Sequence, residues 1–213
     1  MPGYGGGTGS LEQLAARLNA AGHTTTVLHL AGDGTGDLMV QARLLQATVD
    51  GLLADGATSV DVVGYSAGGI VARLWADELG GAAHARRIVL LGSPNHGTTW
   101  AALAATMAGS LCAPACHQMV PGSYLLRTLD QAGTPSGPGW LSLWTDQDQV
   151  VTPPDSASLA GADDLTVQSV CPGEQVDHIG LPTDPVVEGI VIRALAAAPF
   201  HVPGPADCAA LKA

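Results

Sequence analysis

Apolar side chains follow two kinds of pattern along the 213-residue chain. Where they recur every three or four residues, the pattern is typical of helices with one buried face. Such helices are predicted to begin at the capping residues Ser10, Asp37 and Thr183, and to end near Gly22, Gly56 and Leu195. Short apolar runs rich in β-branched residues predict strands instead, and they occur at residues 24–30, 60–65, 87–92, 140–145 and 165–170.

The alternation of these segments predicts an α/β fold with an open, right-handed, doubly wound and mostly parallel sheet. Residues 88–91 are wholly apolar, as expected for a strand covered by helices on both faces. Residues 97–138 are rich in Ala, Gly, Pro and Ser, so we expect there an excursion of helices and loops near the functional site. The chain length fits one domain over residues 1–213.

Charged residues are sparse and mostly acidic, since 19 Asp and Glu against 8 Lys and Arg give a net charge of −11. Such a surface disfavours nucleic acid and anionic membranes as partners. Lys212 is the only lysine, which excludes P-loop phosphate binding and Schiff-base chemistry. The glycine clusters at 5–7 and 34–36 do not match the dinucleotide-binding fingerprint. We therefore expect no nucleic-acid partner, and no apolar stretch reaches the length of a transmembrane segment.

Ser66 lies at the centre of the sequence Gly64-Tyr65-Ser66-Ala67-Gly68, between a predicted strand and a predicted helix. A serine hydroxyl is a poor nucleophile until a base activates it and backbone N–H groups stabilise the oxyanion. Glycines two residues on either side let the chain turn sharply and let helix and strand pack closely. This context is the one that a nucleophile elbow requires. We therefore interpret Ser66 as a nucleophile rather than as part of an ordinary loop.

The loops after the last two predicted strands carry Asp146, Asp148 and His178, which gives the chain order serine, acid, histidine. Functional groups of open parallel sheets gather beyond the carboxyl ends of the strands. We predict His178 as the base because, of seven histidines, it alone lies between the last strand and the last helix. His96, which we interpret as part of a structural turn, is the alternative. We prefer Asp148 as the acid because Val150 and Val151 follow it and can seat its loop against the core. Asp146 remains the alternative acid.

A glycine-rich segment at residues 3–7 precedes the first predicted helix. We expect the oxyanion of an acyl-transfer intermediate to accept hydrogen bonds from two backbone N–H groups. One belongs to Ala67, and Tyr4 in the glycine-rich segment is the candidate for the other. A disordered glycine tail is the alternative interpretation of this segment.

Four cysteines permit three pairings that the sequence does not distinguish. We favour Cys112–Cys116, which would close a local turn, and Cys171–Cys208, which would hold the C-terminal tail to the loop that carries His178. A zinc site is the alternative, but paired Cys-x-x-Cys spacing is absent and we expect no metal. Paired cysteines and a single lysine indicate a secreted protein. No signal-peptide pattern follows Met1, so we expect Met1 to begin a trimmed chain.

Together these segments resemble the small lipases and esterases of the bacterial α/β-hydrolase superfamily, in particular compact lidless enzymes and secreted actinobacterial relatives. The resemblance covers nearly the whole chain and rests on residues 2–6, 64–69, 92–98, 148–151 and 178–181. It implies a single-domain α/β-hydrolase with Ser66, Asp148 and His178 as its triad, Tyr4 and Ala67 as oxyanion donors, and no metal or other cofactor. The family has an apolar strand before the oxyanion loop. The resemblance therefore implies a minimal version of the fold that lacks the first strand.

We expect a secreted, monomeric serine ester hydrolase, either a lipase or an esterase, that cleaves acyl esters or lipids through an acyl-enzyme intermediate. Polymeric esters are compatible with an open, lidless cleft, and an acyltransferase or a peptidase would use the same triad. A truncated, inactive binding module is the non-enzyme alternative. The apolar residues expected along the substrate path are Tyr4, Met119, Val150, Ile179 and Leu181.

Overall fold

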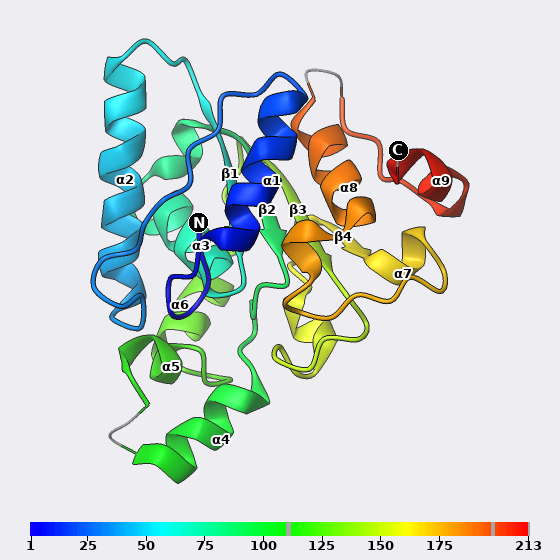
Figure 1. Ribbon diagram of the computed structural model, residues 1–213. Coiled ribbons are helices and arrows are strands. Elements are labelled where there is room, and N and C mark those ends of the chain that lie inside the picture. Colours follow the sequence, from blue (N-terminus) through cyan, green and yellow to red (C-terminus); the bar gives the residue numbers. More distant parts are fainter. Residues whose placement is uncertain (110–111, 197–198, 213) are drawn as a thin grey trace.

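The computed structural model describes residues 1–109, 112–196 and 199–212, and its sheet has the order β1-β2-β3-β4 (Figure 1). The strands are β1 (Val60–Tyr65), β2 (Ala85–Leu91), β3 (Gly139–Trp144) and β4 (Asp163–Thr166). All neighbouring pairs are parallel, with Val63 opposite Val89 and Leu90 opposite Ser142. Because parallel strands need long crossover connections, helices must lie on the faces of this sheet.

The helices build one apolar core on each face of the sheet, with α1 and α8 on the near side in Figure 1. Helices α2 (Leu38–Ala54), α3 (Ala67–Glu78) and α6 (Tyr124–Ala132) contribute to the first core, and α1 (Gly9–Ala20) and α8 (Pro185–Leu195) to the second. Successive side chains of β2 point to opposite faces, so Ile88 and Leu90 join the first core while Val89 and Leu91 join the second. The remaining helices are α4 (Thr99–Ala108), α5 (Pro114–Gln118), α7 (Val167–Val170) and α9 (Cys208–Leu211), with 3-10 turns at Gly81–Ala83, Pro154–Ala157, Leu181–Thr183 and Pro205–Asp207.

Two of the strand predictions were wrong in part or in full. Residues 24–30 form no strand, because no strand of the described chain pairs with them. The predicted strand at 165–170 ends early, since β4 stops at Thr166. The Thr166 side chain accepts a hydrogen bond from the Ser169 N–H at 3.0 Å and so begins α7. Within the described part of 97–138 the chain forms α4, α5 and α6.

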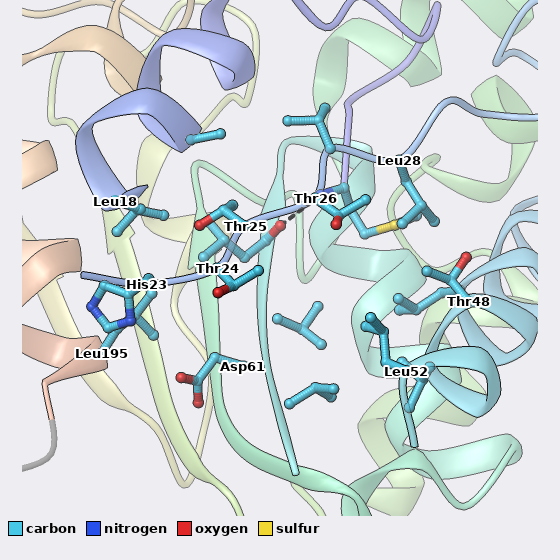
Figure 2. Close-up of a pocket in the computed structure, with 18 of the residues that line it drawn as sticks. Leu18, His23, Thr24, Thr25, Thr26, Leu28, Thr48, Leu52, Asp61 and Leu195 are labelled. Atoms are coloured by element: carbon cyan, nitrogen blue, oxygen red, sulfur yellow. Dashed lines mark hydrogen bonds between the residues drawn. The ribbon is translucent and has the colours of Figure 1, made fainter. Parts of the chain in front are cut away.

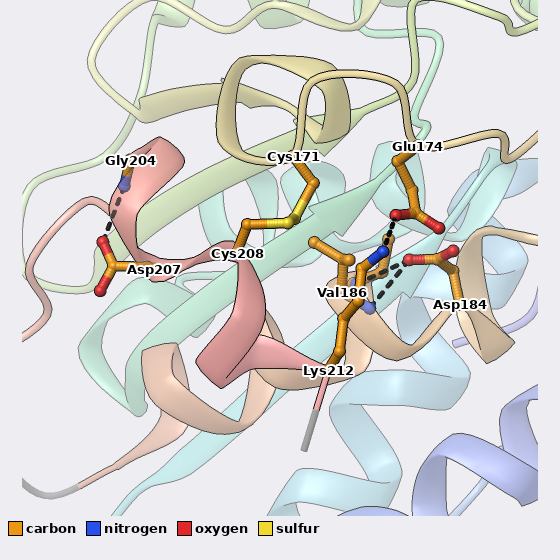
Figure 3. The surroundings of a disulfide bond; sticks show 9 residues. Cys171, Glu174, Asp184, Val186, Gly204, Asp207, Cys208 and Lys212 are labelled. Atoms are coloured by element: carbon orange, nitrogen blue, oxygen red, sulfur yellow. Dashed lines mark hydrogen bonds and ion pairs between the residues drawn. A yellow bond between two sulfur atoms is a disulfide. The ribbon is translucent and has the colours of Figure 1, made fainter.

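The helix caps were predicted correctly at one of three positions. The Asp37 carboxylate accepts a hydrogen bond from the Met39 N–H at 2.7 Å and caps α2. Ser10 lies inside α1, which begins one residue earlier, after Thr8. Thr183 belongs to a 3-10 turn, and Asp184 caps α8 instead (Figure 3), because its carboxylate accepts from two N–H groups at 2.9 and 3.1 Å.

The structure contains the disulfides Cys112–Cys116 and Cys171–Cys208, the same pairs that the sequence favours over a zinc site. Figure 3 shows Cys208, the first residue of α9, bonded to Cys171 after α7. In the same region Lys212 forms an ion pair with Glu174. These two links hold the C-terminal segment to the loop that leads to His178.

Among the described residues, no helix combines the length and the apolar character that a transmembrane helix requires.

Met1 lies beside the outer edge of β1. Its amino group donates a hydrogen bond to the Val63 carbonyl at 2.7 Å, and its carbonyl accepts one from the Tyr65 N–H at 3.0 Å. The Met1 side chain is buried in the first core. Met1 thus pairs with the outer edge of β1 through two backbone hydrogen bonds.

The buried amino group of Met1 should make stability depend on pH. Burial lowers the pKa of this amine from 8.0 to about 5. Between those values the unfolded chain binds a proton that the folded protein does not, so the free energy of unfolding should fall as the pH is lowered from 8 to 5. The expected loss is about 1.4 kcal/mol per pH unit and roughly 4 kcal/mol over the whole window. Urea unfolding at several pH values measures it, with protein acetylated at Met1 as the control. The same pH dependence in both proteins would contradict the prediction.

Candidate active site

Ser66 lies at the turn between β1 and α3 with a φ of 54° and a ψ of −127°. A positive φ is unfavourable for any residue with a Cβ and persists only where the surroundings hold it. The neighbouring glycines allow this geometry. A Cβ at Gly64 would lie 2.6 Å from the Gly68 carbonyl oxygen, and a Cβ at Gly68 would lie 2.5 Å from the carbonyl oxygens of Met1 and Pro2. Strand, helix and N-terminal segment therefore meet at the serine without room for larger residues.

The structure brings Ser66, His178 and Asp148 into one hydrogen-bonded series. His178 Nε2 lies 3.0 Å from Ser66 Oγ, and His178 Nδ1 lies 2.7 Å from Asp148 Oδ2. The three residues are 8%, 5% and 5% exposed, so the series is largely shielded from water. Such an arrangement holds an imidazole between a carboxylate and a hydroxyl, with one ring nitrogen facing each.

Asp148 is fixed by its own loop. Its Oδ1 accepts hydrogen bonds from the N–H groups of Val150 and Val151, both at 2.8 Å, which leaves Oδ2 for His178. The sequence suggested that the valine side chains seat this loop, and the Val151 side chain is indeed buried. Asp146 is exposed, and its Oδ2 lies 3.4 Å from Thr166 Oγ1. Among the described residues, Asp146 forms no hydrogen bond with His178. The structure thus brings Asp148, and not Asp146, to the imidazole.

Tyr65 supports the histidine loop, a role that the sequence reasoning missed. Its hydroxyl donates a hydrogen bond to the His178 carbonyl at 3.0 Å, and the two rings lie 5.2 Å apart. Burial raises the pKa of Tyr65 to about 12, and the nearby Asp148 and Asp177 carboxylates act in the same direction. The phenol therefore keeps its proton at neutral pH and remains a donor. The only signal in the sequence is that Tyr65 ends the strand before the serine.

The segment after β2 braces the acid loop. Thr98 Oγ1 donates to the Val150 carbonyl at 2.6 Å and accepts from the Thr152 N–H at 3.1 Å. Thr98 also caps α4, and this capping position is the signal by which the sequence could have identified it. His96, the alternative base, is exposed and has the carboxylate of Asp130 at 3.3 Å. His96 thus lies in a turn that supports the site and has no hydrogen bond to the serine.

The glycine-rich segment passes directly beside the nucleophile. A Cβ at Gly3 would lie 2.9 Å from Ser66 Cβ and 3.4 Å from its Oγ. The Gly5 N–H donates to the Gly34 carbonyl at 3.2 Å, so this segment is not a free tail. Within the part of the chain that the structure describes, the N–H groups of Tyr4 and Ala67 donate to no protein acceptor. Both are thus available to a ligand next to Ser66.

The five candidate substrate residues differ in exposure. Tyr4 is 36% exposed with its ring edge-on to Trp100, at a centroid distance of 6.4 Å, and Ile179 is 71% exposed. Val150 is half-buried. Met119 and Leu181 are buried, the first in the core around α2 and α3 and the second in the core around α1 and α8. Met119 is 4% exposed and Leu181 is fully buried, so these two side chains belong to the cores.

Solved structures with a similar chain path are lipases and other hydrolases. Aspergillus fumigatus lipase B is 18% identical, with a TM-score of 0.82 over 99% of this chain and 54% of that chain. Bacillus licheniformis lipase BlEst2 in its mature form is also 18% identical, with a TM-score of 0.69 over 84% of this chain and 83% of that chain. An extracellular α/β-hydrolase from a Paenibacillus species is 14% identical, with a TM-score of 0.54 over 91% and 94% of the two chains.

This chain has the α/β-hydrolase fold. The fold inferred from the sequence is therefore confirmed. The chain spans about half of the length of the Aspergillus lipase. No protein-family model matches the sequence, and no curated protein does. At these identities the α/β-hydrolase neighbours establish the fold, and the chemistry has to be argued from the site.

Proposed function

We propose that this α/β-hydrolase is a secreted serine carboxylic-ester hydrolase that cleaves apolar acyl esters through an acyl-enzyme intermediate. The observation that carries the proposal is the series Ser66–His178–Asp148, with heteroatom distances of 3.0 and 2.7 Å at a strained strand–helix turn. A buried hydroxyl–imidazole–carboxylate series is the arrangement that activates a serine nucleophile.

Each residue has a defined part in the proposed reaction. His178 Nε2 accepts the proton of Ser66 as Oγ bonds to the ester carbonyl carbon, and the carbonyl oxygen becomes an oxyanion. The N–H groups of Ala67 and Tyr4 stabilise that oxyanion. His178 then gives the proton to the departing alkoxide, which leaves as the alcohol, and an acyl-serine remains. A water molecule then attacks the acyl-serine by the same steps, which releases the carboxylic acid and restores the serine. Asp148 stays ionised and holds the proton of the imidazole on Nδ1.

A serine-directed phosphonate ester tests this proposal. We expect one equivalent of p-nitrophenyl phosphonate to label the peptide that contains Ser66 and to abolish hydrolysis of p-nitrophenyl butyrate in proportion to labelling. In the variant His178→Ala the labelling rate should fall by at least about 10³-fold, because the base is lost. Full hydrolysis by completely labelled protein, or label on a different residue, would reject Ser66 as the nucleophile.

An uncharged apolar surface beside the site favours water-insoluble substrates. Residues 88–126 contain no Asp, Glu, Lys or Arg. Helix α4 exposes Trp100, Leu103 and Met107, whose spacing places them on one side of the helix, and Trp100 contacts Tyr4. A neutral apolar stripe continuous with the oxyanion loop suits the surface of an emulsified or polymeric ester, because no charge has to leave water on contact.

The double variant Leu103→Ser/Met107→Ser should separate insoluble from dissolved substrates. We expect it to hydrolyse emulsified tributyrin about fivefold more slowly, because less apolar area is buried at the interface. The rate on dissolved p-nitrophenyl acetate should stay within about twofold. Val40→Ser on α2 is the matched control, since Val40 is 50% exposed and Leu103 is 57% exposed. Equal losses on both substrates, or the same loss in the control, would contradict the assignment of this surface.

Two further observations support secretion. Both cysteine pairs are oxidised, which suits an oxidising compartment. One of the structurally similar proteins is an extracellular hydrolase. Release of active enzyme into the medium by the native host, measured against a cytoplasmic marker, tests the location.

A further inference from the structure

Asp148 and His178 belong to two loops of the chain. The acid loop, residues 145–152, follows β3, and the histidine loop, residues 171–180, follows α7. The two side chains meet through the 2.7 Å contact between Asp148 Oδ2 and His178 Nδ1. Both side chains are short, so this contact forms only while the two backbones keep a fixed separation. A shift of about 1 Å in such a pair can cost a factor of about 10² in rate.

The outer side of the two loops is open. There they border a surface depression of about 500 Å³, whose lining includes Gln147 of the acid loop and Gln175, Asp177 and Gly180 of the histidine loop. An open depression leaves no neighbouring side chain to press the loops together. Hydrogen bonds therefore have to set the separation of the loops on this side.

The Thr145 hydroxyl makes the first link between the loops. It is fully buried and donates to the Val176 carbonyl at 2.7 Å. It accepts from the Gln147 N–H and from Gln168 Nε2, both at 3.1 Å. A hydroxyl has one donor site and two acceptor sites, so its whole hydrogen-bonding capacity is used. One buried oxygen atom thus joins the backbone of the acid loop to the backbone of the histidine loop.

The Gln168 side chain makes the second link, from α7. Its Oε1 accepts from the Asp146 N–H at 3.0 Å, and its Nε2 donates to the Glu174 carbonyl at 3.2 Å. Helix α7 is itself anchored, because Val167 and Val170 are buried in the core around α1 and α8. A single amide group therefore holds both loops to one fixed helix.

Both links lie close to the catalytic pair along the chain. Thr145 precedes Asp148 by three residues, and Val176 precedes His178 by two. The Asp148 N–H donates to the Thr145 carbonyl at 3.2 Å, which closes a tight turn. A movement of Thr145 would therefore carry Asp148 with it, and a movement of Val176 would carry His178.

We propose that Thr145 and Gln168 are positioning residues that hold Asp148 against the imidazole of His178. Their relevance to catalysis rests on the proposed function. Without the two links the loops would separate toward the open depression, and the imidazole would lose its hydrogen bond to Asp148. Among the hydrogen bonds of the described residues, those of Thr145 and Gln168 do not reach Ser66, so both would act through the catalytic pair.

The test observes the Nδ1 proton of His178 by NMR in protein labelled with ¹⁵N-histidine, with His178→Ala to assign the signal. Because this proton faces a carboxylate and is shielded, we expect a low-field resonance that exchanges slowly with water. In Gln168→Leu and in Thr145→Val the resonance should move upfield and exchange at least about tenfold faster. Thr145→Ser keeps the hydroxyl and should restore both the resonance and the slow exchange.

The same variants should change kcat more than KM for p-nitrophenyl butyrate. We expect kcat to fall by about 30-fold in Gln168→Leu and by about 100-fold in Thr145→Val, with KM within about threefold. A displaced carboxylate weakens the base in the transition state but leaves the ground-state contacts of the substrate in place. Thr145→Ser should recover kcat to within about threefold of the original protein.

Gln175→Leu is the matched control for the chemical change. Gln175 lies in the histidine loop and is exposed, and its amide donates at 3.3 Å to the Gly173 and Glu174 carbonyls of that same loop. It therefore makes no link to the acid loop among the described hydrogen bonds. We expect the Nδ1 resonance to be unchanged in this variant and kcat to stay within about twofold.

Val49→Ala is the control for a general loss of stability. Val49 is 2% exposed and lines a pocket of about 420 Å³ beside β1, around which Figure 2 shows Leu18, Thr48 and Leu52. Neither loop of the catalytic pair lines this pocket. The variant should lower Tm by about 5 °C and leave the Nδ1 resonance unchanged.

Two results would overturn the proposal. The first is an unchanged resonance and kcat in both Gln168→Leu and Thr145→Val, and the second is an equal change in either control. If Thr145→Val does not fold, Gln168→Leu gives the answer alone, because Gln168 is half-buried and water can replace its hydrogen bonds. The resonance is recorded without substrate. A protein that shows the expected resonances but cleaves no ester would therefore reject the proposed function and leave the positioning of Asp148 by these two residues intact.

Discussion

Replacing Ser66 with alanine should lower kcat/KM for p-nitrophenyl butyrate by about 10⁴-fold or more, because the atom that forms the acyl bond is removed. The remaining rate would come from the oxyanion donors and from substrate binding alone. His178 and Asp148 would keep their own 2.7 Å contact, so little of the fold depends on the hydroxyl. Stopped-flow or steady-state assays measure the rate, and thermal unfolding reports whether the protein remains folded.

The variant Ser66→Gly is the matched control for stability. Ser66 has a φ of 54°, which costs energy for alanine as well as serine but not for glycine. Both variants should be inactive, and the glycine variant should be more stable than the alanine variant by about 1 kcal/mol. Hydrolysis by both variants at the original rate would remove Ser66 from the mechanism. The opposite order of stability would contradict the strain at this position.

The parts of the fold that were predictable depend on local chemistry. The elbow is local, since glycines at fixed offsets from Ser66 permit a turn that other residues block. The Asp37 cap is local too, because its carboxylate reaches an N–H two residues away. Residues 24–30 have a strand pattern as well, but a strand also needs a partner at the right distance. The partner is a property of the whole sheet, so the sequence of residues 24–30 could not decide the outcome.

The candidate site likewise combines features that the local sequence predicts with features that depend on the whole fold. Chain order placed a histidine and two acids in the right loops, because parallel strands end at one edge of the sheet. The choice between Asp146 and Asp148 depends on the backbone of the following residues, whose N–H groups orient the carboxylate. The supporting role of Tyr65 depends on its hydrogen bond to His178, which lies 113 residues further along the chain. No local pattern encodes such a contact.

Replacing Asp148 with asparagine should lower kcat by about 10⁴-fold, close to the effect of losing the serine. The asparagine oxygen can still accept from the N–H groups of Val150 and Val151, so the loop should keep its shape. Its NH₂ group, however, would face His178 Nδ1 and donate to it. The imidazole would then carry its proton on Nε2, where it cannot accept the proton of Ser66.

Asp146→Asn is the matched control, because it makes the same chemical change two residues away on an exposed side chain. We expect its kcat to stay within about twofold and its unfolding to be unchanged. Asp148→Ala should be inactive and also less stable, by about 1–3 kcal/mol, because the two backbone N–H groups of the loop lose their acceptor. A larger loss of kcat in Asp146→Asn than in Asp148→Asn would assign the acid to Asp146. It would also mean that the acid loop rearranges when substrate binds, since of these two carboxylates it is Asp148 that lies beside the imidazole in the folded chain.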